Sequence, residues 1–190
     1  MAESPLVSRP IDEFLDQLAS DAPTPGGGAV AALTGALAAS LGRMVCGLTL
    51  GRKKFAEVEP QVAQIASHLT RAAGMLKQLI DEDAAAYAEL SAVFKMDKSD
   101  PKRKTRLVET AGLAAAVPLE TTAVTRQVLS DLRRLEPIGN PNLRSDVEAG
   151  IHLAQAAMQA AAANVRVNLP LLPEEQAREV AKELDQLLNA

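Results

Sequence analysis

The chain has 190 residues, a formal net charge of −4, a hydrophobic fraction of 47% and four aromatic residues, none of which is Trp. This length predicts a single domain over residues 1–190, and the acidic balance argues against a nucleic-acid partner, because such proteins usually carry a basic face. One cysteine and two histidines exclude an intrachain disulfide and argue against a His/Cys zinc site. The N-terminal residues show no signal-peptide pattern, so a cytoplasmic protein is expected.

Good helix formers dominate the sequence and no segment alternates with period two, which predicts an all-α fold. The first helix is expected at Ile11–Ala19 and the second at Gly27–Leu50. The second helix carries an apolar row flanked by Ala, Gly and Ser, which indicates a central, buried helix. That row consists of Val30, Leu33, Leu37, Leu41, Met44 and Leu48. Its uncharged run is too rich in Ala to indicate a membrane span.

Four further helices are expected at Glu57–Lys95, Asp100–Glu136, Ser145–Asn168 and Glu174–Leu188. Pro118 falls inside the second of these, where a proline removes one backbone hydrogen bond. Long helices joined by short turns predict an antiparallel bundle of about six helices.

The segment "PTPGGGAV" places three glycines at the start of the second helix. A phosphate loop is excluded because Ala29 and Val30 follow Gly28 where Lys and Ser or Thr are required. A dinucleotide fingerprint matches only formally, because no strand precedes it. With Thr24 as the N-cap, the glycines could present bare backbone amides to an anionic ligand. Close helix packing explains the same glycines equally well, so both interpretations remain.

Asp83 interrupts an apolar stripe along the helix expected at Glu57–Lys95. A buried carboxylate is costly unless it is paired or hydrogen-bonded. Arg43 is the candidate partner for a purely structural role. The alternative is acid/base chemistry, since perturbed acids in clefts are candidates for such work.

Polar residues also mark both ends of the helix expected at Ser145–Asn168. Asp146 and Asn164 share one face but lie about 27 Å apart along it. One pocket in one subunit cannot use both ends, so either one end is structural or a dimer brings both into play. Arg52, Lys53 and Lys54 form a basic cluster beyond the second helix, suited to its dipole or to an anionic ligand tail.

These segments, taken in order, resemble the formiminotransferase-cyclodeaminase C-terminal family over about Ile11–Leu169. The motifs that carry the resemblance are "APTPGGGAVAALTGALAASL", "MVCGLTLGRKKF", "IDEDAAAYAEL", "VPLETT" and "GNPNLRSDVEAG" followed by "NVRVN". The family includes stand-alone bacterial methenyltetrahydrofolate cyclohydrolases of the serine-cycle type. The resemblance implies an all-helical homodimer that acts on a tetrahydrofolate derivative without a metal or redox cofactor.

The resemblance also implies the site residues. The catalytic candidates are Asp83, Asp146 and Lys53, with either aspartate as the base and Lys53 near the leaving nitrogen. The substrate-binding candidates are Pro25, Gly26, Gly27, Gly28, Lys54, Asn140, Asn142, Asn164 and Asn168. The chain departs from the family pattern at Gly47, where Asn is usual, at Arg52, where Lys is usual, and at Leu143-Arg144, which replaces a smaller pair.

Two reactions are implied by the family. The first, and the one expected here, hydrolyses 5,10-methenyltetrahydrofolate to 10-formyltetrahydrofolate. The alternative closes 5-formiminotetrahydrofolate to the methenyl form with loss of ammonia. Absence of the formiminotransferase domain from this sequence favours the hydrolase, by analogy. A third possibility, which Gly47 leaves open, is a non-enzymatic helical interaction domain.

Overall fold

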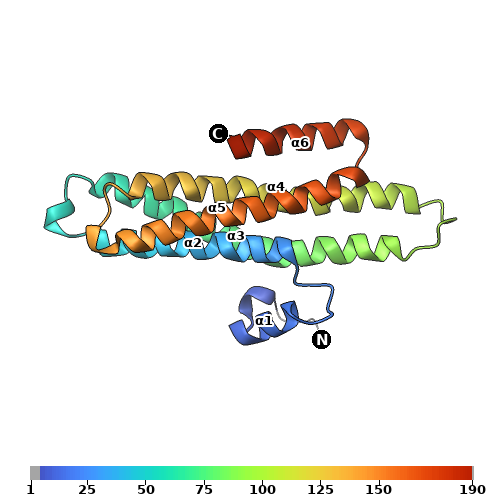
Figure 1. Cartoon of the computed structure of the whole chain (residues 1–190), viewed down its shortest axis with the longest axis horizontal. Coiled ribbons are helices and arrows are strands. Elements are labelled where there is room, and N and C mark those ends of the chain that lie inside the picture. Colours follow the sequence, from blue (N-terminus) through green and yellow to red (C-terminus); the bar gives the residue numbers. More distant parts are fainter. Residues whose placement is uncertain (1–4, 190) are drawn as a thin grey trace.

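The computed structural model describes residues 5–189, and those residues contain helices and turns but no strand. Four long helices form the bundle: α2 (Gly27–Thr49), α3 (Glu59–Phe94), α4 (Arg103–Leu135) and α5 (Arg144–Asn168). Two shorter helices, α1 (Ile11–Leu18) and α6 (Glu174–Asn189), lie on opposite sides of the bundle in Figure 1. The predicted all-helical fold is confirmed, and the six expected α-helices all occur within the described residues.

Helix α2 packs against α3, α4 and α5. Its buried faces consist mainly of Ala and Gly, which lets the neighbouring backbones approach closely. At Gly42, an added Cβ would lie 2.5 Å from a Leu132 methyl and 2.7 Å from a Leu69 methyl. α2 and α4 are long and apolar enough to cross a membrane by length and composition alone, a test that the core helices of soluble proteins also pass.

The larger apolar residues of α2 are more exposed than the sequence pattern predicts. Leu37, Met44 and Leu48 are 51%, 41% and 39% exposed, while Val30, Leu33 and Leu41 are half-buried. The prediction that this row is buried was wrong, because the small faces of α2 occupy the bundle interior and turn the row outward. α2 therefore presents this row as a partly exposed apolar face, which we call the α2 apolar face. Val30 and Leu33 at its start pack against the core.

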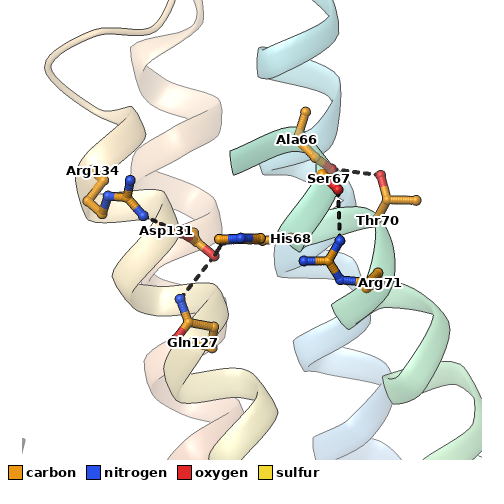
Figure 2. Close-up of polar contacts among 8 residues, drawn as sticks. All are labelled: Ala66, Ser67, His68, Thr70, Arg71, Gln127, Asp131 and Arg134. Carbon is orange, nitrogen blue, oxygen red and sulfur yellow. Dashed lines mark hydrogen bonds and ion pairs between the residues drawn. The ribbon is translucent and has the colours of Figure 1, made fainter. Parts of the chain in front are cut away.

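A polar cluster around the buried Asp131 joins α3 to α4 (Figure 2). The Asp131 side chain is only 1% exposed. It accepts hydrogen bonds from Arg134 at 3.1 Å and from Gln127 at 3.2 Å. His68 Nδ1 lies 3.4 Å from Asp131 Oδ2, the oxygen that also accepts from Gln127. Two hydrogen-bond donors, Arg134 and Gln127, therefore satisfy the buried carboxylate, as a buried charge requires.

Candidate active site

A cleft of about 420 Å³ opens at the N-terminal end of α2. We call it the Gly–Asp cleft, because Gly26, Gly27, Gly28 and Asp83 line it. Asn164 and Asn168 from the end of α5 line it as well. These six predicted site residues are therefore brought together. A larger cleft of about 530 Å³, between α4, α5 and α6, contains none of the predicted site residues.

The carboxylate of Asp83 caps the N-terminus of α2. Its Oδ2 accepts a hydrogen bond from the Ala29 amide at 2.9 Å, and first-turn amides have no partner within their own helix. The N-cap residue is Gly26, which has no side chain to supply that acceptor. Asp83 thus does from α3 what an N-cap side chain does locally in other helices. The prediction of Thr24 as the N-cap was wrong, because α2 begins at Gly27.

Gly28 is required by the position of the Asp83 carboxylate. A Cβ added to Gly28 would lie 1.9 Å from Asp83 Oδ1, a distance at which the carboxylate could not stay. The glycine run therefore makes space for this side chain as well as exposing backbone to the cleft. Pro25 lies directly before the run and is buried, but it does not line the cleft.

Burial raises the pKa of Asp83 above its ordinary range, and the hydrogen bond from Ala29 partly opposes this shift. Asp83 forms no ion pair with any residue in 5–189. The prediction that Arg43 could pair with Asp83 was wrong. Arg43 lies about 22 Å further along α2 than the first turn of the helix, which Asp83 contacts. There its Nε donates to Thr70 Oγ1 at 2.8 Å. The cleft consequently holds an unpaired carboxylate with weakened preference for its charged form.

The side-chain nitrogens of Asn164 and Asn168 are both bound to backbone carbonyls. Asn164 Nδ2 donates to the Ala160 carbonyl at 2.9 Å. Asn168 Nδ2 donates to the carbonyls of Ala114 at 2.8 Å and Asn164 at 2.9 Å. The amide oxygens therefore remain as acceptors in the cleft that Asp83 also lines. Gly27 allows this arrangement, since its Cβ would lie 3.1 Å from Asn164 Nδ2.

Two aromatic residues form a further wall of the cleft, and they were not among the site residues predicted from the sequence. Tyr87 and Phe94 line it and are 46% and 49% exposed. They are two of the chain's four aromatic residues and lie two helical turns apart, with Tyr87 one turn beyond Asp83. Both residues fit the apolar stripe of α3, so the sequence pattern alone predicts them to be core residues.

The remaining predicted site residues lie at the other end of α2, about 33 Å away. The Asn140 amide donates to Thr49 Oγ1 at 3.0 Å, and Asn140 Oδ1 accepts from the Asn142 amide at 3.2 Å. Lys54 Nζ lies 4.5 Å from the centre of the Phe55 ring. Lys53 is exposed, and Asp146 lies in the first turn of α5. Within one subunit, these five residues do not reach the Gly–Asp cleft.

The arrangement suits a flat, positively charged ligand. Tyr87 and Phe94 offer ring faces and edges, while Asp83 and two amide oxygens offer negative charge and acceptors. Asp83 is the charged residue that lines the cleft, and burial raises its pKa, so its carboxylate has the chemistry of a general base.

Comparison with known proteins gives a consistent result. Residues 10–186 match the formiminotransferase-cyclodeaminase family. A methenyltetrahydrofolate cyclohydrolase of Methylorubrum extorquens is 37% identical, and the match covers 94% of this chain and 88% of that protein. A formimidoyltransferase-cyclodeaminase of Gallus gallus is 30% identical over 90% of this chain, which spans only 32% of that relative. The solved structure of a formiminotetrahydrofolate cyclodeaminase from Thermotoga maritima superimposes with a TM-score of 0.87 at 30% identity, covering 95% of this chain and 88% of that one.

Proposed function

The chain belongs to the formiminotransferase-cyclodeaminase family, and we propose that it hydrolyses 5,10-methenyltetrahydrofolate to 10-formyltetrahydrofolate. One observation carries the choice of reaction: the cyclohydrolase of Methylorubrum extorquens is 37% identical over 88% of its length, whereas the two cyclodeaminase relatives are each 30% identical. The Gly–Asp cleft supports the chemistry, because it holds one unpaired carboxylate beside a surface for a flat ring.

The methenyl substrate is a delocalised cation, so its bridge carbon is already electrophilic. Asp83 removes one proton from a water molecule as the water oxygen bonds to that carbon. The tetrahedral intermediate then collapses: the bond to N5 breaks, the hydroxyl proton leaves as the carbonyl forms, and N5 takes up a proton. The formyl group stays on N10, and one proton is released overall. This sequence calls for neither a metal nor a redox cofactor.

The cleft walls hold the substrate while this occurs. Tyr87 and Phe94 pack against the ring system, and the oxygens of Asn164 and Asn168 accept from its N–H groups or balance its charge. The bare backbone at Gly26 and Gly27 lets the ligand approach the start of α2, where a helix favours negatively polarised atoms such as a carbonyl oxygen.

The protein works as a homodimer in this proposal, with two α2 apolar faces packed antiparallel about a two-fold axis. An exposed apolar helix face of this kind indicates an interaction site. The row from Val30 to Leu48 has its midpoint at Ala39, and Thr24, which lines the Gly–Asp cleft, and Lys54 lie equally far from that midpoint along the chain. A two-fold axis there brings the partner's Lys53 and Lys54 beside the Gly–Asp cleft.

The dimer gives roles to the distal residues. The partner's Lys53 protonates N5, and the partner's Lys54 binds a folate carboxylate. The partner's Asp146 and its neighbours Asn140 and Asn142 orient the ring. The acidic chain acts in the cytoplasm, with no nucleic-acid or membrane partner.

Cyclodeaminase activity is the second candidate, favoured by the TM-score of 0.87 to a solved cyclodeaminase. The same residues of the cleft would act on 5-formiminotetrahydrofolate. In that reaction ammonia leaves as the ring closes, whereas in the hydrolysis water adds as the ring opens. A non-enzymatic role for the fold is the third.

The purified protein should be offered each substrate separately. We expect near-ultraviolet absorbance of methenyltetrahydrofolate to decay many times faster than in buffer, with little ammonia from the formimino substrate. Fast ammonia release with slow methenyl decay would assign the cyclodeaminase reaction, and inactivity toward both would leave the non-enzymatic role.

A further inference from the structure

The larger cleft, of about 530 Å³, lies on the side of the bundle covered by α6 (Figure 1). We call it the arginine cleft. α4 contributes Arg126, Ser130 and Arg133 to its wall, and α5 contributes Gln155 and Gln159. It shares no lining residue with the Gly–Asp cleft, so it is a separate feature of the surface.

The charge of the arginine cleft opposes that of the whole chain. Three arginines line it and, among the described residues, no Asp or Glu does, although the net charge is −4. Arg134 is bound to Asp131 at 3.1 Å, as Figure 2 shows. Arg126 and Arg133 form no hydrogen bond or ion pair within residues 5–189. Two guanidinium groups are therefore free to bind a ligand.

The spacing of these groups defines the ligand. Arg126 and Arg133 lie two turns apart on α4, about 10.5 Å along the axis, with Ser130 between them. Gln155 and Gln159 lie one turn apart on the facing helix and add amide donors. Four apolar residues also line the cleft: Leu129, Met158, Leu187 and Leu188. An elongated molecule with an anionic group at each end and a less polar body matches this lining.

We propose that the arginine cleft binds a small molecule carrying at least two carboxylate or phosphate groups. A guanidinium fork pairs with either oxyanion through two parallel hydrogen bonds. The free arginines supply the two ends, and Ser130 with the α5 glutamines supplies neutral donors between them. Binding here is independent of the chemistry in the Gly–Asp cleft.

Calorimetric titration of the full chain tests this proposal at constant ionic strength. Pimelate probes the carboxylate class, and fructose 1,6-bisphosphate probes the phosphate class. At least one should bind at a single site with a Kd of about 1 mM or tighter. The Asp83→Asn variant should bind it as well as wild type, which separates this site from the proposed active site.

The decisive comparison uses a double variant, Arg126→Gln with Arg133→Gln, checked for helical content by circular dichroism. It should bind at least tenfold more weakly. The control pair, Arg166→Gln with Lys182→Gln, removes two exposed charges outside the cleft and should bind like wild type. Absence of saturable binding of both probes to wild type, or equal losses in the two double variants, would overturn the proposal.

Discussion

At the scale of single residues, Asp83 has two opposite effects on the stability of the protein: it caps a helix, and it places a carboxylate in a buried position. Its carboxylate oxygen completes the first turn of α2 through Ala29, which stabilises the helix. Burial at the same time raises its pKa, so the ionised form costs the folded protein free energy. A base kept in such surroundings trades stability for reactivity.

This conflict predicts different effects for two substitutions of Asp83. Asp83→Asn keeps an oxygen for the Ala29 amide and removes the buried charge, so the free energy of unfolding at pH 7 should stay equal or rise. Asp83→Ala removes the cap and should cost about 1 kcal/mol. Urea unfolding of both variants measures this. A larger loss for the Asn variant than for the Ala variant would contradict the capping role.

The raised pKa of Asp83 also predicts the pH dependence of catalysis. The base works only when ionised, so kcat/KM should fall on the acid side as the carboxylate becomes protonated. Because burial shifts this pKa upward, the midpoint should lie above the ordinary aspartate value of about 3.9. A pH–rate profile gives the midpoint, and a value at or below the ordinary one would argue for another base.

At the scale of elements, the start of α2 depends on Gly28. In Gly28→Ala, the added methyl must displace the Asp83 carboxylate, which lies 1.9 Å from the Cβ position. A displacement of about 1 Å can lower turnover by about 100-fold, and overpacking should cost about 1–3 kcal/mol. The control is Gly74→Ala, at a helical position with open space around it. It should raise stability by about 0.5–1 kcal/mol and leave turnover unchanged, as steady-state kinetics and urea unfolding can show.

The sequence predicts the helices well because their signals are local. Helix-forming residues, prolines and polar turns determine where each of the six helices begins and ends to within a few residues. The orientation of α2 was predicted wrongly, because hydrophobicity favours burying Leu over Ala. In the bundle, three neighbours approach α2 closely through Ala and Gly, and this contact excludes the Leu row from the interior.

The site was predictable where a residue breaks a pattern and unpredictable where it depends on tertiary contact. Asp83 is visible as a charge in an apolar stripe. Its contact with Ala29 and Gly28 joins positions more than 50 residues apart, so no local sequence pattern predicts this contact. Tyr87 and Phe94 agree with the stripe, so nothing in periodicity separates them from core residues.

At the scale of the whole molecule, a single subunit does not explain two features of the structure. Leu37, Met44 and Leu48 of the α2 apolar face are left exposed by residues 5–189, and Lys53, Asn140 and Asp146 lie far from the Gly–Asp cleft. A single antiparallel contact between two α2 helices would account for both observations, which is why we propose a homodimer through this face.

Leu37→Glu should test this contact, because it puts a charge into the α2 apolar face at a residue already 51% exposed. We expect a monomer by light scattering, with helical content retained and hydrolysis largely lost, since the cleft lacks the partner's lysines. Leu113→Glu is the matched control, at 52% exposure outside that face. It should remain dimeric and active. A dimeric Leu37→Glu variant would place the interface elsewhere.

The central claim is that Asp83, in the Gly–Asp cleft, activates water for hydrolysis of the methenyl bridge. The most direct measurement compares wild type and Asp83→Asn at saturating 5,10-methenyltetrahydrofolate, following the near-ultraviolet absorbance decay at one pH. Asp83→Asn preserves the shape of the side chain and a hydrogen-bond acceptor, so the variant should fold like wild type and a loss of turnover reports on the missing base. The account predicts turnover at least about 100-fold lower in the variant. Turnover within a few-fold of wild type would contradict it.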